Sequence, residues 1–193
     1  AEMATFSSLK RLGIKSQITF HSVALNDFRS TSKVLEEVNP DEIYNLAGQS
    51  SVGLSFEQPL ETLESIANAT VNILEAIRFI NFKCKFYNAS SSECFGDTGK
   101  YPANEETPFR PKSPYGIAKA SAYWQVANYR ESYGLFGCSG IMFNHESILR
   151  PTRFVTRKIC QSAAKIALGK ESLLKLGNLT IKRDWGWAPE YVE

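Results

Sequence analysis

Four side chains in the middle of this chain have types and spacing that suit proton transfer. Ser91 and Glu93 follow an apolar run, and Tyr115 and Lys119 lie four residues apart just after a Ser-Pro pair. Residues at that spacing share one face of a helix, and an ammonium beside a phenol lowers the pKa of the phenol by stabilising the phenolate. We therefore expect Tyr115 to act as general base, Ser91 to hydrogen-bond the same substrate oxygen, and Glu93 to take a second proton from a neighbouring carbon.

An alternative for the Tyr-x-x-x-Lys pair is a surface pair on an amphipathic helix with no catalytic role. The polar run Ser-Ser-Ser-Glu favours the catalytic interpretation, because it follows a buried strand predicted over Lys85–Ala89. Open α/β sheets bind their ligands at the carboxyl ends of their strands. Ser113 can cap, and Pro114 can begin, the helix that carries Tyr115. These signals together favour a site at the edge of a sheet.

Apolar periodicity and turn residues predict the remaining scaffold as strands alternating with helices. Further strands are expected at Ile18–Val23, Glu42–Ala47 and Phe136–Phe143, with a short one just before Arg183. Helices are expected at Ser30–Val38, Pro59–Phe79 and Phe154–Leu168, and helix-like spacing is also present over Ala1–Gly13. The chain thus has enough elements for one α/β domain.

The composition describes an ordinary globular domain and excludes several functional classes. Its 193 residues are 43% hydrophobic and 22% charged, which suffices to bury a sizeable core. The net charge of +2 comes from 22 basic and 20 acidic residues without a basic block, so no nucleic-acid partner is expected. No signal peptide or membrane span is evident. The four cysteines are scattered, which predicts reduced thiols in a cytoplasmic protein and no structural metal.

Six segments, in order along the chain, resemble the extended short-chain dehydrogenase/reductases and, within them, the GDP-mannose 4,6-dehydratase family. They are Glu42–Ser50, Phe86–Gly96, Ser113–Lys119, Phe143–Ser147, Phe154–Ile159 and Arg183–Gly186. The Tyr-x-x-x-Lys pair by itself indicates only the superfamily. Glu93, together with the runs Asn-His-Glu-Ser and Val-Thr-Arg-Lys, points to this family, and the resemblance spans almost all of the chain.

The resemblance implies an α/β fold built on a Rossmann-like, doubly wound parallel sheet. A truncated NADP-binding domain would span residues 1–146, and part of a small substrate domain residues 147–193. The family has two strands and a glycine-rich phosphate loop before the point that matches Ala1, so we expect the chain to be truncated at both ends. In the sheet order 3-2-1-4-5-6 the Glu42–Ala47 strand is then an edge. Exposed edges favour association, so we expect Ile18–Val23 or a partner chain to pair with it.

The resemblance also implies a reaction, the conversion of GDP-D-mannose to GDP-4-keto-6-deoxy-D-mannose. Tyr115, aided by Ser91 and Lys119, would take the C4 hydroxyl proton as hydride leaves C4 for NADP. Glu93 would then remove the C5 proton and help to expel water from C6, where the hydride returns. In the family, the helix that matches Pro59–Phe79 and the helix with the tyrosine pair subunits, which implies a homodimer or a higher homo-oligomer.

Binding residues are carried over from the family position by position. Those matched to NADP contacts are Leu46, Gln49, Ser50, Tyr115, Lys119, His145 and Arg150, and those matched to the nucleotide sugar are Asn144, Arg157, Lys158 and Arg183. Without the resemblance, Gln49 and Ser50 would belong to an ordinary polar loop, and the three basic residues to a solvated face. His145 alone would be a satisfied histidine at a strand end.

Two alternatives for the function remain open at this stage. A related sugar-nucleotide epimerase or 4-keto reductase needs the hydroxyl, the phenol and the lysine but no carboxylate at position 93, and it releases no water. The second alternative is a catalytically incompetent fragment that acts only as an assembly or binding module, because a phosphate loop is the main anchor of a dinucleotide. Ser91 stands where the family usually has threonine, a change that keeps the hydroxyl.

Overall fold

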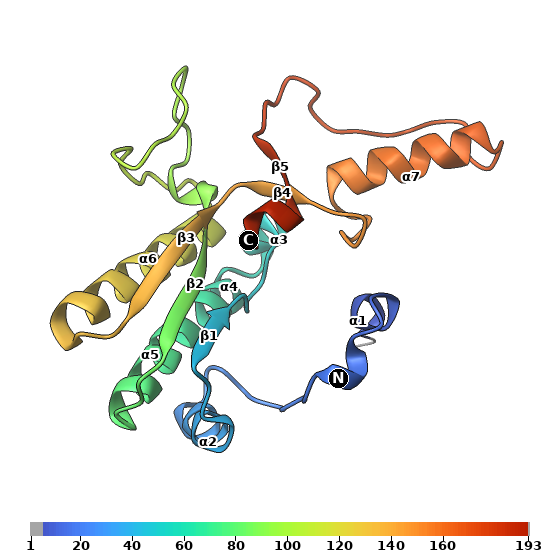
Figure 1. Ribbon diagram of the computed structural model, residues 1–193. Coiled ribbons are helices and arrows are strands. Elements are labelled where there is room, and N and C mark those ends of the chain that lie inside the picture. Colours follow the sequence, from blue (N-terminus) through green and yellow to red (C-terminus); the bar gives the residue numbers. More distant parts are fainter. Residues whose placement is uncertain (1–5, 193) are drawn as a thin grey trace. The chain divides into compact units, whose positions relative to one another are not determined.

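Three parallel strands form the centre of the larger of two compact units (Figure 1). The computed structural model describes residues 6–192, and the larger unit spans His21–Met142. Strands β1 (Glu42–Asn45), β2 (Lys85–Ser91) and β3 (Gly137–Met142) lie side by side in that order, all parallel. Three of the predicted strands are thereby confirmed. Because the strands are parallel, their carboxyl ends lie along one edge of the sheet.

Helices connect the strands, and several begin at the capping residues that the sequence offers. They are α2 (Phe28–Val38), α3 (Val52–Glu57), α4 (Pro59–Leu63), α5 (Ala69–Phe79) and α6 (Pro114–Tyr133). The side chains of Asp27, Ser51 and Ser113 cap α2, α3 and α6 by accepting a hydrogen bond from a backbone N–H. The helix predicted over Pro59–Phe79 is present, but a π-helical turn at Glu64–Asn68 separates α4 from α5.

The core lies between the sheet and the helices α5 and α6 on one of its faces (Figure 1). Phe86 of β2 is 1% exposed and belongs to one cluster with Leu74 and Ile77 of α5 and Val126 of α6. Each such side chain contributes about 1.5–3 kcal/mol by leaving water. Burial alternates along β2, as expected for a strand with one covered face. The opposite face carries Tyr44, which is 64% exposed.

Residues 18–23, predicted as a strand, form no strand, and β1 is the outer strand of its sheet. The prediction was wrong because alternating apolar residues form a strand only where a neighbouring strand supplies hydrogen bonds. Ile18 and Phe20 are 38% and 45% exposed, and the Phe20 ring packs on Phe6 with 4.4 Å between centroids. The expected pairing of this segment with β1 was therefore also wrong. Cover of β1 by a partner chain stays a prediction.

The smaller unit contains the residues up to Phe20 and from Phe143 onward. Its elements are α1 (Ser7–Arg11), β4 (Asn144–Glu146), α7 (Val155–Ala167) and β5 (Trp185–Trp187), and β4 pairs with β5 in parallel. Two predicted helices are confirmed as α1 and α7, although residues 1–5 lie outside the described residues. The strand expected just before Arg183 was wrong. The residues that pair with a neighbouring strand come after Arg183, in β5. The predicted domain boundary after residue 146 stays a prediction.

Neither a membrane helix nor a metal cluster is found among residues 6–192. No helix in that range is both long and apolar enough to cross a membrane. No three His, Cys, Asp or Glu side chains in the same range gather as metal ligands would. The cysteines are free thiols, and burial raises the pKa of Cys84 and Cys94.

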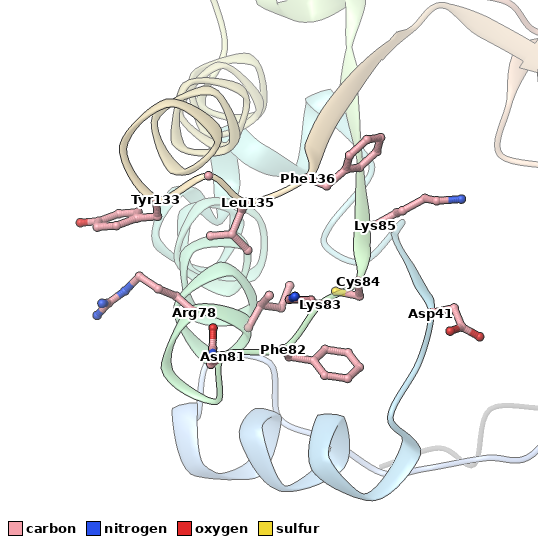
Figure 2. A pocket seen from close by; sticks show the side chains of 12 residues that line it. Asp41, Arg78, Asn81, Phe82, Lys83, Cys84, Lys85, Tyr133, Leu135 and Phe136 are labelled. Atoms are coloured by element: carbon pink, nitrogen blue, oxygen red, sulfur yellow. The ribbon is translucent and has the colours of Figure 1, made fainter.

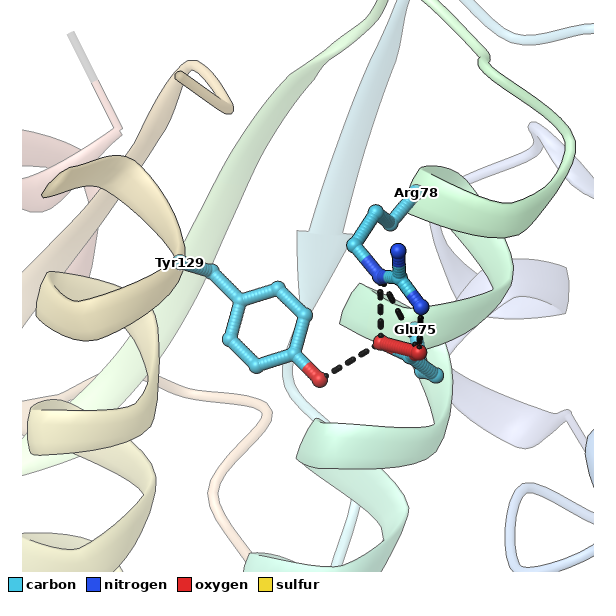
Figure 3. A network of polar contacts seen from close by, with 3 residues as sticks. All are labelled: Glu75, Arg78 and Tyr129. Carbon is cyan, nitrogen blue, oxygen red and sulfur yellow. Dashed lines mark hydrogen bonds and ion pairs between the residues drawn. The ribbon is translucent and has the colours of Figure 1, made fainter. Parts of the chain in front are cut away.

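Tyr129 of α6 and Glu75 of α5 join these two helices by a hydrogen bond to a charged group (Figure 3). The Tyr129 hydroxyl donates to Glu75 Oε2 at 2.7 Å, and Arg78 forms an ion pair with the same carboxylate. Hydrogen bonds from Arg78 and Tyr129 lower the pKa of Glu75 to about 2. Burial and the bond to Glu75 raise the pKa of Tyr129 to about 12. The later turns of α5 and α6 are thereby held together.

Replacing Tyr129 by phenylalanine removes this hydrogen bond and keeps the ring. We expect Tyr129→Phe to lower the free energy of unfolding by about 0.5–1 kcal/mol at neutral pH, a modest loss because solvent partly screens the group. The depressed pKa of Glu75 contributes stability that is fully present above its unfolded value of 4.5 and is lost as the pH falls toward about 2. Urea unfolding curves should therefore show the difference from wild type shrinking over that acidic range.

The matched control is Tyr133→Phe on the same helix. Arg78 lies over the Tyr133 ring, 5.1 Å from its centroid, and phenylalanine keeps that ring. We expect this control to leave the free energy of unfolding nearly unchanged. Equal losses in the two variants would contradict the role given to the Tyr129 hydroxyl.

Candidate active site

Ser91, Tyr115 and Lys119 come together at the carboxyl edge of the sheet in the larger unit. Ser91 ends β2 and is 9% exposed, Tyr115 lies in the first turn of α6, and Lys119 is 7% exposed. Lys119 Nζ donates to the backbone carbonyl oxygen of Ala89 at 2.7 Å and lies 5.8 Å from the centre of the Tyr115 ring. A hydrogen bond joins the side chains of Ser91 and Tyr115. Lys119 is therefore buried, and Tyr115 half-buried, beside the strand end.

Glu93 lies in the 3₁₀ turn Ser92–Cys94, which follows β2 directly. Its backbone N–H donates to Ser91 Oγ at 3.3 Å, and its side chain is half-buried. The carboxylate is near enough to Tyr115 for its charge to act on the phenol. The turn thus places a carboxylate near the hydroxyl of Ser91 and the phenol of Tyr115.

Gly116 lets the first turn of α6 approach this 3₁₀ turn closely. A Cβ atom at position 116 would lie 2.7 Å from the carbonyl oxygen of Glu93, closer than real Cβ atoms come to oxygen. The backbone N–H of Gly116 donates to Ser113 Oγ at 3.0 Å. The buried Cys94 lies in the same place, with its sulfur 3.5 Å from Ser90 Oγ. This close approach is what sets Tyr115 against the end of β2.

Burial raises the pKa of Tyr115 above its usual value of 10, so the lowering expected from Lys119 was wrong. The hydrogen bond with Ser91 acts in the opposite direction, and the nearby Cys94 and Glu93 also raise this pKa. Lys119 directs its ammonium to Ala89, and burial lowers the pKa of Lys119 itself. The spacing of the two residues indicated a shared helix face but carried no information about burial. The phenol of the free chain is consequently protonated at neutral pH.

The loop after β1 lies at the same edge of the sheet and is held by its own polar groups. The Gln49 side-chain amide donates to a backbone carbonyl of the loop at 2.8 Å and to Thr62 Oγ1 at 3.2 Å. Gly48, with φ at +109°, lies so close to the π-helical turn that a Cβ atom there would clash. Leu46 is 70% exposed, and Ser50 is exposed as well. Leu46 and Ser50 are thus free to meet a ligand, whereas the Gln49 side chain shapes the loop.

Aromatic rings hold the long loop between the 3₁₀ turn and α6. Phe109 of this loop packs on Phe95 with 5.3 Å between centroids and on Tyr123 of α6 with 4.8 Å. Tyr123 in turn packs on Trp124, 5.3 Å away, and Trp124 is 61% exposed. The rings therefore anchor the end of the loop to α6 and to Phe95, just after the 3₁₀ turn.

Six of the predicted binding residues lie in the smaller unit: Asn144, His145, Arg150, Arg157, Lys158 and Arg183. The structure joins His145 to Arg150, whose Nη1 donates to the His145 carbonyl oxygen at 2.5 Å. Arg157 and Lys158 follow one another in the first turn of α7. Arg183 is exposed, and among the described contacts it hydrogen-bonds only the neighbouring Lys182. The expected grouping of Arg183 with the α7 pair stays a prediction.

A cavity of about 670 Å³ lies at the opposite, amino edge of the sheet (Figure 2). Its lining includes Asp41, Lys85 and Phe136, which precede or begin the three strands, and Arg78 and Tyr133 from the ends of α5 and α6. Cations near the carboxyl ends of helices offset the helix dipole. Lys85 is paired with Glu42 and Arg78 with Glu75. The cations of this cavity are thus largely engaged, and none of the predicted catalytic residues lines it.

Comparison with known sequences shows which family this chain belongs to. A family model described as GDP-mannose 4,6 dehydratase matches residues 2–193. The chain is 50% identical over 175 residues to GDP-mannose 4,6-dehydratase of Vibrio cholerae serotype O1, an alignment that covers 90% of this chain and 47% of that protein. Over 183 residues it is 46% identical to GDP-mannose 4,6 dehydratase 1 of Arabidopsis thaliana, covering 93% and 50% respectively.

The chain belongs to the GDP-mannose 4,6-dehydratase family. It spans about half the length of these relatives. Among solved structures it is similar to RMD from Pseudomonas aeruginosa complexed with NADPH, with a TM-score of 0.85 and 23% identity, covering 97% of this chain and 68% of that one. It is also similar to DesIV, a dTDP-glucose 4,6-dehydratase from Streptomyces venezuelae with NAD and TYD bound, with a TM-score of 0.84, 19% identity, and coverage of 97% and 56%. These likenesses confirm the Rossmann-like α/β fold.

Two features of this candidate site could not be found by looking for reactive side chains. Lys119 donates to the main-chain carbonyl of Ala89. Every residue has such a carbonyl, so the amino-acid type gives no sign of this role. Gly116 did leave a signal, because glycine near the start of a helix costs about 0.5–1 kcal/mol relative to alanine. Such a glycine marks a close approach of backbone, and here the approaching segment is the 3₁₀ turn with Glu93.

Replacing Gly116 by alanine should force α6 and the 3₁₀ turn apart. We expect Gly116→Ala to lower the free energy of unfolding by about 1–3 kcal/mol, because the added methyl group meets backbone that cannot rotate away. Urea unfolding measures this loss. Gly53→Ala in α3 is the control, because a Cβ there meets only Ser51 Oγ at 4.0 Å, and it should be neutral or stabilising. A stabilising effect of Gly116→Ala would refute the close approach.

Titration of Tyr115 tests which neighbour controls the phenol. With ¹³C-labelled tyrosine, the Tyr115 ring signal should titrate above pH 10, and Ser91→Ala should raise this pKa further because it removes the opposing hydrogen bond. Ser92→Ala serves as the control and should leave the pKa unchanged. If Lys119→Met shifts the pKa of Tyr115 more than Ser91→Ala does, the ammonium and not the hydroxyl governs it.

Proposed function

We propose that this chain supplies Ser91, Glu93, Tyr115 and Lys119 as the catalytic residues of an NADP-dependent GDP-mannose 4,6-dehydratase, a hydro-lyase. The observation that carries the proposal is the meeting of Ser91, Tyr115 and Lys119 at the carboxyl end of β2, with Glu93 in the adjoining turn. The names of the relatives, GDP-mannose 4,6-dehydratases at 46–50% identity, support the substrate. The product is GDP-4-keto-6-deoxy-D-mannose.

Hydrogen-bond donors and exposed groups at this edge of the sheet could bind a nicotinamide cofactor. Lys119 Nζ is buried and its described hydrogen bond uses one of three donors, so two remain for ribose hydroxyls. The exposed Leu46 and Ser50 offer an apolar and a polar contact at the same edge of the sheet. RMD, a structural neighbour, was solved with NADPH, and we assign NADP to this chain on that likeness. His145 and Arg150 are assigned to the same cofactor.

In this proposal each catalytic residue handles a defined proton. Tyr115 Oη takes the C4 hydroxyl proton, while the Ser91 hydroxyl holds the same oxygen and favours the phenolate. The bound nicotinamide would accept the C4 hydride and return it to C6. Oxidation at C4 acidifies C5, so Glu93 removes the C5 proton and passes it to the departing C6 hydroxyl, which leaves as water. When the hydride returns to C6, the proton held by Tyr115 returns to C5. The sum is the loss of one water from the sugar, with no net oxidation of the cofactor.

The nucleotide part of GDP-mannose is assigned to the smaller unit. Arg157 and Lys158 at the start of α7 supply two cations beside a helix amino end, a combination that suits a pyrophosphate. Asn144 and Arg183 are the remaining candidates, for the sugar and the phosphates respectively. Arg183 is exposed, with its described hydrogen bond going to the adjacent residue, so its guanidinium retains donors for an anion.

We also propose a homo-oligomer that pairs through α4–α5 and α6 in the cytoplasm. The support is an exposed apolar surface on these helices. Leu60, Ile117 and Trp124 are 77%, 53% and 61% exposed, more than isolated apolar residues on a stable surface require. Free cysteines without disulfides agree with a reducing compartment.

The deciding experiment incubates the chain with NADP and GDP-mannose and follows the sugar nucleotide by mass spectrometry. We expect a product lighter by one water, and Glu93→Gln should slow its formation by about 10²–10⁴-fold, because the C5 proton then has no acceptor. Glu105→Gln, which changes an exposed carboxylate in the neighbouring loop, is the control and should keep wild-type rates.

The same assay separates the alternatives. Products of unchanged mass that are epimers of the substrate would indicate an epimerase, and the dehydratase proposal would fail. Absence of turnover together with absence of NADPH binding by calorimetry would indicate a binding or assembly module, an outcome that the half-length of the chain makes worth testing.

A further inference from the structure

Glu146 lies at the centre of a polar network in the smaller unit. The proposed function gives this residue no role. Its Oε2 accepts a hydrogen bond from the Thr156 hydroxyl in the first turn of α7. The same oxygen lies 3.2 Å from Arg150 Nε, in an ion pair whose side chains are only 17% and 16% exposed. One carboxylate therefore holds both Arg150 and the beginning of α7.

The guanidinium of Arg150 is held on three sides. Glu146 lies at ion-pair distance from Nε without accepting a hydrogen bond from it. Nη1 donates to the carbonyl oxygen of His145 at 2.5 Å, and the Phe154 ring lies 3.9 Å from Cζ, measured to the ring centroid. Such a fork has five N–H donors, and these contacts use a minority of them. The arginine is thus oriented by protein groups while donors remain for a ligand.

We infer that Glu146 is a positioning residue that presents Arg150 to the anionic part of a bound dinucleotide, while its separate hydrogen bond with Thr156 only fixes the beginning of α7. The inference rests on the proposed function, because it takes the assignment of Arg150 to the cofactor from there. A carboxylate suits this task. It attracts the guanidinium by charge, and at 16% exposure it does so where solvent screens the pair only partly.

A purely structural role of Glu146 would give a different pattern of losses in variants. If Glu146 only joined β4 to α7, its loss would weaken folding and ligand binding to similar extents whether or not Arg150 were present. If Glu146 acts through Arg150, its effect on binding disappears once Arg150 is removed. A double-mutant cycle distinguishes the two, because residues that act through one another give non-additive losses.

The experiment measures NADPH binding by fluorescence for the wild-type chain, Glu146→Gln, Arg150→Gln and the double variant. We expect Glu146→Gln to weaken binding about 5- to 50-fold, the range for losing one charge-assisted contact. The double variant should bind no more weakly than Arg150→Gln alone. Glu190→Gln, an exposed carboxylate of the same unit, is the control and should bind as wild type. Additive losses, or unchanged binding in Glu146→Gln, would overturn the inference.

Two further measurements distinguish a failure of this inference from a failure of the proposed function. Thr156→Val removes only the bond from Glu146 to α7, so it should lower the thermal unfolding midpoint without changing NADPH affinity by more than about twofold. The Nε–H signal of Arg150 in ¹⁵N spectra of the ligand-free chain should be sharp in wild type and broadened in Glu146→Gln. If wild type fails to bind NADPH, the proposed cofactor fails, and this signal still decides whether Glu146 orients Arg150.

Discussion

A buried ammonium must be hydrogen-bonded, and the arrangement of this site depends on how Lys119 meets that requirement. Its acceptor is the main-chain carbonyl of Ala89 in β2. The bond ties the second turn of α6 to the last residues of the strand. The first turn of α6 is thereby brought to the strand's carboxyl end, where Tyr115 meets Ser91. A lysine facing solvent would exert no such constraint, since exposed charges hold little structure.

The burial that fixes Lys119 also opposes the ionisation that a general base needs. Desolvation raises the pKa of Tyr115 and lowers that of Lys119, so burial opposes the charged form of both residues in the free chain. Ser91 is the described group that counteracts this for the phenol. A bound ligand that adds donors or positive charge would favour the phenolate of Tyr115, the proposed base.

The sequence was sufficient to predict the structural features that depend on local residue patterns. The strands at Glu42, Lys85 and Gly137, the cap at Ser113 and the face shared by Tyr115 and Lys119 all follow from periodicity and turn chemistry. It failed where the outcome depends on a distant partner. Residues 18–23 alternate like a strand but pair with no other strand among the described residues. The pKa of Tyr115 depends on burial, which the spacing of residues does not reveal.

The interruption of the long helix has a similar origin. The apolar pattern over Pro59–Phe79 continues without a break, and nothing in it marks the π-helical turn at Glu64–Asn68. That turn lies where Gly48 brings the loop after β1 against Ile66 and the carbonyl oxygen of Ser65. The turn therefore contacts a loop that carries predicted cofactor residues. π-turns inside helices often occur at functional sites, and this one agrees with that tendency.

Beneath the site, buried side chains fix where that loop begins. The Asn45 amide donates to Asn88 Oδ1 at 3.1 Å and to Thr70 Oγ1 at 3.2 Å, linking β1 to β2 and to α5. β1 has β2 as its one described neighbour, so its register depends on this pairing more than that of a central strand would. A slip of one residue would turn Asn45 to the opposite face and leave Asn88 without this donor. Because Leu46 follows Asn45 directly, the same hydrogen bonds that set the register also set the position of the predicted cofactor loop.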